Sequence, residues 1–133
     1  VSTPLFPADY ADTYVEVRDC RQNSGSHNFN RIRVLADPAA LAPYRDRAGD
    51  FPAGAVVLKE EHAFEDSDCS GDVIRWTAME RLADPAANPD LLGWHWQDVA
   101  ADRTVVSDDQ PACYGCHTDC EGAEGYEGTC TDP

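Results

Sequence analysis

The chain has 133 residues and a net charge of −15, with 25 acidic against 10 basic residues. This charge argues against binding to nucleic acids and to anionic membrane surfaces, because both are themselves negatively charged. The length predicts one domain, residues 1–133, with a single hydrophobic core. No apolar run is long enough to span a bilayer.

The N-terminal part of the chain predicts a short helix followed by a strand. Asp9 can cap a helix over residues 8–18, although the alternation of residues 14–17 leaves a strand as the rival prediction. Residues 22–26 are a polar loop. Residues 28–36 then alternate between apolar and charged side chains, which predicts a strand.

Asp37 and Pro38 follow this strand and predict a helix over residues 39–45, with Asp37 as its N-cap and Pro38 in the first helical position. A second strand is predicted over residues 55–63. It leads into a polar loop at residues 66–72, where the acidic side chains indicate a solvated turn or, alternatively, a calcium site without EF-hand spacing.

The remaining chain predicts two further strands, over residues 73–82 and 92–99. A linking segment over residues 102–110 connects them to a cysteine motif, and a Gly-rich acidic tail, residues 121–133, follows it. We therefore expect the α+β class: an antiparallel β-sheet with short helices and a C-terminal attachment segment.

The cysteine motif is Cys113-Tyr114-Gly115-Cys116-His117. This spacing is typical of c-type haem attachment, in which two thiols bind the vinyl groups and the histidine ligates the iron. It predicts one covalent haem c, with Cys113 and Cys116 as tethers and His117 as axial ligand. Two alternatives are a zinc site completed by Cys120 and a redox dithiol, although no βαβ pattern surrounds the cysteines.

Four cysteines remain, an even number that can form two disulfides in three pairings. We favour Cys120 with Cys130, which lie close in sequence, and therefore Cys20 with Cys69. Disulfides and c-type haem both indicate a periplasmic or otherwise exported protein. We expect the chain to be a mature form whose export signal has been removed.

Four blocks resemble the cytochrome P-460 family, including its relative cytochrome c′-β, over residues 28–117. They are RVLADPAA at 33–40, FPAGAVVLKE at 51–60, the strand 76–81 followed by GWHW at 93–96, and the haem motif. The resemblance implies a mostly antiparallel sheet, a homodimer, a periplasmic setting and a five-coordinate haem with an open distal side.

The resemblance also implies a role for Lys59, the only lysine in the chain. In the cross-linked members of the family, a lysine at this position is bonded to the porphyrin edge. Such a bond requires a neutral amine, and lysine can lose its proton where arginine cannot. The alternative is an ordinary ion pair with Glu60 or Glu61 at the end of the strand.

Around the predicted distal positions the chain offers Phe29, Ile32, Thr77 and Met79. Phe29 and Ile32 lie on opposite faces of a regular strand, so both face the haem only if the strand bulges. A mostly apolar set favours the binding of small neutral ligands over proton-coupled oxidation, which needs a base near the iron.

Other side chains are candidates for a sixth iron ligand or for proton transfer. Met79 packs in the core or ligates the iron. The other candidate ligands are His27, His62 and His95, and the candidate proton-transfer acids are Glu60, Glu61 and Glu80.

The sequence thus predicts a haem protein that binds or oxidises small nitrogen species, nitric oxide or hydroxylamine, and passes electrons to a redox partner protein. The alternatives are a six-coordinate electron-transfer cytochrome c and a zinc-stabilised binding module.

Overall fold

The computed structural model describes residues 2–22, 27, 29–120 and 126–130. Parts of the predicted loop at 22–26 and of the predicted tail at 121–133, and the first residue of the strand predicted at 28–36, lie outside these residues. Among the described residues, no helix has the length and apolar character that crossing a membrane requires.

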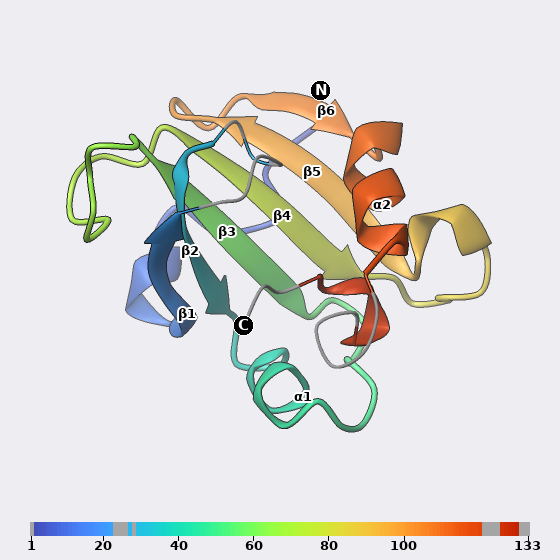
Figure 1. Cartoon of the computed structure of the whole chain (residues 1–133). Coiled ribbons are helices and arrows are strands. Elements are labelled where there is room, and N and C mark those ends of the chain that lie inside the picture. Colours follow the sequence, from blue (N-terminus) through green and yellow to red (C-terminus); the bar gives the residue numbers. More distant parts are fainter. Residues whose placement is uncertain (1, 23–26, 28, 121–125, 131–133) are drawn as a thin grey trace.

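Six strands form one antiparallel sheet in which each strand pairs with its neighbour in sequence, in the order β1-β2-β3-β4-β5-β6 (Figure 1). The strands are β1 Val15–Gln22, β2 Arg31–Ala36, β3 Val56–His62, β4 Arg75–Arg81, β5 Trp94–Ala100 and β6 Val105–Asp108. The helices are α1 Leu41–Asp46 and α2 Pro111–Thr118, with 3₁₀ turns η1 Tyr10–Asp12, η2 Pro89–Leu91 and η3 Tyr126–Gly128. The predicted α+β fold is confirmed.

The helix predicted over residues 8–18 is wrong, and its rival, a strand, is the observed structure. Only η1 is helical there, and β1 begins at Val15, which pairs with Ala36 of β2. Aromatic and β-branched residues such as Tyr14, Val15 and Val17 pack well on a pleated sheet, and this tertiary pairing outweighs a weak helical signal.

Two other boundaries differ from the prediction. The Asp37 carboxylate accepts a hydrogen bond from the Ala40 N–H at 2.8 Å, but this caps the turn that precedes α1, which begins at Leu41. The segment predicted as a link at 102–110 contains β6, which was missed because it is only four residues long.

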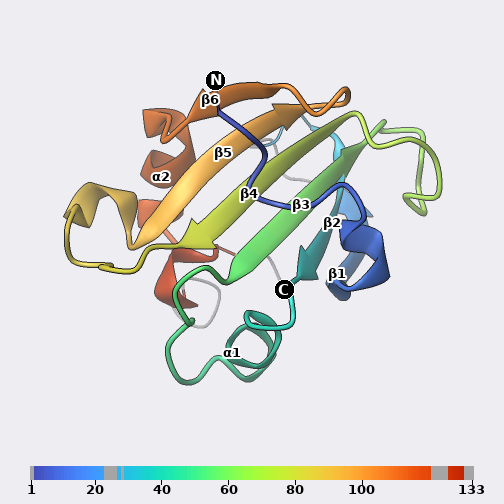
Figure 2. The ribbon, with the colours of Figure 1, turned by 180° about the vertical axis from the view of Figure 1, so that it is seen from behind.

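The two faces of the sheet are covered differently. Paired residues of antiparallel strands share a face, so Lys59, Thr77 and Asp98 lie in one row across β3, β4 and β5. We call this the cavity face; α2 lies over it (Figure 1). The opposite face, the back face, carries Leu58 and Ala78, and the N-terminal segment crosses it over β4 and β3 (Figure 2).

Each face has its own apolar core. On the back face, Phe6 and Tyr10 of the N-terminal segment pack with Leu58 and Trp76. On the cavity face, Val57, Met79 and other buried side chains pack together, and Cys113 and Tyr114 of α2 lie against them. Because both faces are covered, all seven residues of β3 are buried, including Lys59 and the acids that follow it.

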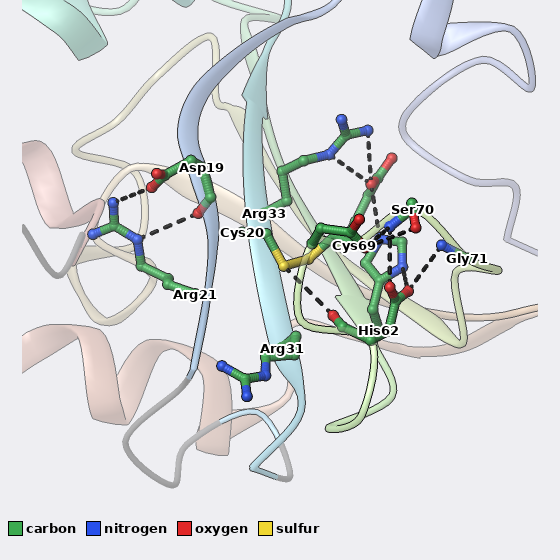
Figure 3. Close-up of a disulfide and its surroundings, with 12 residues drawn as sticks. Asp19, Cys20, Arg21, Arg31, Arg33, His62, Cys69, Ser70 and Gly71 are labelled. Carbon is green, nitrogen blue, oxygen red and sulfur yellow. Dashed lines mark hydrogen bonds and ion pairs between the residues drawn. A yellow bond between two sulfur atoms is a disulfide. The ribbon is translucent and has the colours of Figure 1, made fainter.

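Both cysteine pairs that the sequence favoured are disulfides in the structure. Cys20–Cys69 joins β1 to the loop after β3, near His62 (Figure 3). In that loop, the Asp66 carboxylate accepts hydrogen bonds from the backbone of Ser70 and Gly71. No group of three or more metal-ligating side chains occurs in the part of the chain that the structure describes.

Candidate haem site

Helix α2 presents the predicted attachment residues on neighbouring positions of one turn. It begins with Pro111. Proline suits the first helical position because it lacks a backbone N–H, and an N–H at that position would have no partner within the helix. Cys113 is half-buried and Cys116 is exposed, and both are free thiols. Burial raises the pKa of the Cys113 thiol. His117 follows within the same turn and is buried.

The environment of His117 fixes its ring. The imidazole lies against Trp96 of β5, edge to face, with ring centroids 4.6 Å apart. Its Nδ1 is 2.6 Å from the Gly128 carbonyl, which can only accept a hydrogen bond. The proton is therefore on Nδ1, and the lone pair on Nε2 is available for a metal. Burial lowers the pKa of His117 to about 3, so the ring is neutral.

The segment after α2 holds Gly128 in place. Gly128 has φ of +77°, a conformation that favours glycine. Next to it, the Glu127 carbonyl accepts a hydrogen bond from the Trp94 indole at 2.7 Å, and its carboxylate pairs with Arg81 at 3.0 Å. Cys130 closes the segment through its disulfide with Cys120. This disulfide occupies the thiol that a zinc site would need, which argues against the zinc alternative.

A cavity of about 300 Å³ lies between α2 and the sheet. That volume is at the lower end of the range for small-molecule sites. On one side its wall includes Cys113, Cys116 and His117 with apolar Val57, Met79 and Trp96. Further along the same face the wall is polar, formed by Lys59, Thr77 and Asp98 with His27, Glu61 and Arg75.

The ionisable side chains of the cavity form two groups. Arg75 and Asp98 make a bidentate ion pair, with Nε 2.6 Å from Oδ1. His27 lies between Lys59 and Glu61: its Nε2 is 3.5 Å from Lys59 Nζ, and its Nδ1 is 3.6 Å from Glu61 Oε2. Burial lowers the pKa of His27.

These residues fit a c-type haem. Two free thiols and a neutral buried imidazole lie at spacings that tether the ring and ligate the iron. The cavity wall beside them is apolar, as the porphyrin faces require. Two buried polar atoms of the cavity residues, Thr77 Oγ1 and Glu61 Oε2, make no hydrogen bond within the described part of the chain. Such atoms suit a polar group bound in the cavity.

Of the residues predicted to contact the haem, which are Lys59 and the four distal candidates, the structure places only some beside the cavity. Lys59, Thr77 and Met79 line the cavity. Ile32 is on the same face, paired with Glu61, but it is buried outside the cavity wall. Phe29 precedes β2 and is 65% exposed. The predicted set was mostly apolar, whereas the cavity also holds the four ionisable residues His27, Glu61, Arg75 and Asp98, which come from three strands and a loop.

The other candidate ligands and acids lie on different faces of the sheet. On the back face, His62 contacts Glu60, and His95, which pairs with Glu80, hydrogen-bonds Asp108. Among the histidines, His27 and His117 line the cavity; among the glutamates, Glu61 does. Strand alternation could have separated Glu61 from Glu60, but no sequence signal brings His27 to this face.

The profile of the cytochrome P460 family matches residues 7–125. The chain belongs to the cytochrome P460 family. This confirms the resemblance found in the sequence, and the match extends it toward both ends of the chain. Family membership indicates a haem protein that acts on nitrogen species. No curated protein matches the chain at a significant level.

Proposed function

We propose that the chain binds one covalent haem c through Cys113, Cys116 and His117, and that the haem iron keeps one coordination position open for hydroxylamine or nitric oxide. The observation that carries this proposal is the cavity, bordered by a neutral buried His117 and by a second, polar set of side chains. When bound, the haem supplies an open metal site and accepts electrons from the small molecule.

The chain's own residues have separate tasks in this proposal. Gly128 keeps the proton on Nδ1 of His117, so that Nε2 can ligate the metal. Val57, Met79 and Trp96 exclude water from the ring. Oxidation of hydroxylamine releases protons, and Glu61, which is fully buried at 0% exposure, is the carboxylate in the cavity best placed to accept them.

The covalent haem and its open position can be tested with purified protein. We expect one haem per chain, retained after denaturation, and an absorption spectrum that changes when nitric oxide or hydroxylamine is added. A colourless protein would contradict the proposal. A spectrum that shows a protein ligand on both sides of the iron would contradict the open position.

Proton transfer can be tested with a matched pair of substitutions. Because a positioned base typically contributes at least about 100-fold to a rate, Glu61→Gln should slow hydroxylamine oxidation about 100-fold. Glu80→Gln on the back face should leave the rate unchanged. Equal rates in the two variants would argue that the protein binds the ligand without oxidising it through Glu61.

We further propose that Lys59 is bonded to the porphyrin edge. Its place in the cavity, its burial to 7% exposure and the family membership support this. Mass spectrometry of the haem peptide decides the matter. A haem peptide that carries only the segment around residues 113–117 would rule out the bond.

The alternative function, a six-coordinate electron-transfer cytochrome, is favoured by one observation. Met79 and His27 line the same cavity as His117, and both types of side chain can ligate haem iron. A low-spin spectrum that becomes high-spin in Met79→Ala or in His27→Ala would support this alternative.

We also propose that the protein is exported, forms a homodimer and exchanges electrons with a partner protein. The two disulfides support an oxidising compartment. The family membership supports the dimer, and the net charge of −15 favours a partner with a basic docking surface.

A further inference from the structure

Three side chains in the cavity are ordered as carboxylate, imidazole and amine. Lys59 and Glu61 are two positions apart in β3, so both point to the cavity face. His27 reaches them from the segment before β2. Its Nε2 lies 3.5 Å from Lys59 Nζ, and its Nδ1 lies 3.6 Å from Glu61 Oε2.

The contacts of Glu61 orient this histidine. Asn30 donates a hydrogen bond to Glu61 Oε1 at 3.1 Å, which fixes the carboxylate. Oε2 is buried, makes no hydrogen bond within the described residues, and lies on the side of His27. A buried carboxylate oxygen gains most from a nearby donor, so it favours the proton on His27 Nδ1. The lone pair on Nε2 then points toward the amine of Lys59.

This order matches the arrangement that activates nucleophiles in enzymes. There, a base takes the proton of the nucleophile, and a carboxylate behind the base holds it in the correct tautomer. The other ionisable pair in the cavity does not offer this, because Asp98 is already engaged in two contacts with Arg75.

We propose that His27, oriented by Glu61, is the base that deprotonates Lys59 and so enables its bond to the porphyrin. This inference rests on the proposed Lys59–haem bond and names the residues that make it. His27 acts on the reacting nitrogen itself, and Glu61 is a positioning residue.

First, the Lys59 ammonium passes one proton to His27 Nε2, which gives a neutral amine and an imidazolium stabilised by Glu61. The amine nitrogen then bonds to a ring carbon, while one N–H bond and the C–H bond of that carbon break. The two electrons and two protons released reduce one molecule of hydrogen peroxide to two molecules of water. The step therefore requires a two-electron oxidant, and a peroxide is the class that we propose.

The test uses the full haem-loaded chain, prepared without peroxide and then treated with it. The fraction of haem peptide linked to Lys59 is followed over time by mass spectrometry. His27→Gln keeps a polar side chain but removes the base, and we expect its linkage rate to fall at least tenfold. The matched control is His95→Gln on the back face, which should link at the wild-type rate.

A pH profile separates a base from a merely structural residue. Apart from the thiols of Cys113 and Cys116, which the haem would occupy, the charged or ionisable groups that line the cavity are His27, Lys59, Glu61, Arg75, Asp98 and His117. Without His27, solvent must deprotonate the amine, so the linkage rate in His27→Gln should rise about tenfold per pH unit while the amine is protonated. The wild-type rate should rise less steeply. The pH dependence of the linkage rate in Glu61→Gln should lie between those of the wild type and of His27→Gln.

Each outcome decides a different question. A wild-type linkage rate and profile in His27→Gln would overturn the inference and leave the proposed function intact. A wild-type chain that carries haem but never links Lys59 would overturn the inference and the proposed bond together, with the open iron site unaffected. If His27→Gln does not fold, which its haem content and thermal unfolding would reveal, His27→Asn provides the same comparison.

Discussion

Strand β3 contributes two adjacent acids, Glu60 and Glu61, to opposite faces of the sheet, and their surroundings differ. On the back face, both oxygens of Glu60 have partners: Oε1 accepts from Arg33 and lies 3.1 Å from His62, and Oε2 accepts from Tyr10. On the cavity face, Oε2 of Glu61 has no hydrogen bond from the described residues. Both acids are buried, at 2% and 0% exposure.

This difference distinguishes an acid with a structural role from an acid that can take part in chemistry. A buried carboxylate whose oxygens are all paired holds its neighbours in place. A buried carboxylate oxygen that accepts no hydrogen bond beside a cavity is costly for stability, and binding and proton transfer often involve such groups.

Replacing His117 with Ala should remove the proposed axial ligand and with it the wild-type absorption spectrum and its response to nitric oxide. The matched change on the back face, His62→Ala, should leave the spectrum and the response intact, because His62 does not line the cavity. Visible absorption spectra with and without nitric oxide test both variants. An unchanged spectrum in His117→Ala would place the iron ligand elsewhere.

The two disulfides should differ in their contribution to the free energy of unfolding. Cys20 and Cys69 are 49 residues apart, and Cys120 and Cys130 are 10 apart. In the loop-entropy model, removal costs about 4 kcal/mol for the long loop and about 3 kcal/mol for the short one. Denaturant unfolding of the two double Cys→Ala variants measures this. The Cys120–Cys130 disulfide also closes the segment that contains Gly128. Its loss should therefore disturb the haem spectrum, whereas loss of Cys20–Cys69 should not.

Glu60→Ala should lower the free energy of unfolding by about 3 kcal/mol, because Arg33, His62 and Tyr10 lose a buried partner. Glu61→Gln on the cavity face keeps the hydrogen bond from Asn30 and should cost about 1 kcal/mol or less. Denaturant unfolding of the two variants measures both losses. Equal losses would show that the two acids have the same structural role.

The back face should also respond to alkaline pH. Burial, followed by the hydrogen bond to Glu60, raises the pKa of Tyr10 to about 12. The unfolded chain loses this proton near pH 10. Between pH 10 and 12 the native state therefore binds more protons than the unfolded state, and stability falls by up to about 1.4 kcal/mol per pH unit. Unfolding at several pH values should show this slope, and Tyr10→Phe should reduce it.

The residues proposed to attach the haem could be singled out from the sequence because their motif is local. Cys113, Cys116 and His117 need only their spacing to be recognised, and the antiparallel sheet followed from alternation and turn residues. The environment of β3 was harder to predict. The run Lys59-Glu60-Glu61-His62 has the composition of an exposed strand end, yet all four side chains are buried. The N-terminal segment covers the back face, and His27 and Asn30 of the segment before β2 lie against Lys59 and Glu61 on the other.

The meeting of His27 with Lys59 could not be predicted for a related reason. His27 follows a polar segment without periodicity, so no pattern assigns it to a face of the sheet. Its position depends on how the chain enters β2, which is a tertiary property. The role of the Gly128 carbonyl, which orients His117, could likewise not be predicted, because the tail is rich in glycine and acidic residues and shows no periodic pattern.

Lys59 and Glu61 lie on one face of the sheet, and Glu60 and His62 lie on the other. The hydrogen-bonding register of β3 therefore determines which side chains reach the cavity. Deleting one residue early in this strand would slide the rest by one position and exchange the two sets between the faces. The sheet could still pair, but the cavity would then receive an acid and a histidine in place of an amine and an acid. The residue count within β3 is therefore fixed by the chemistry that its side chains must supply to each face.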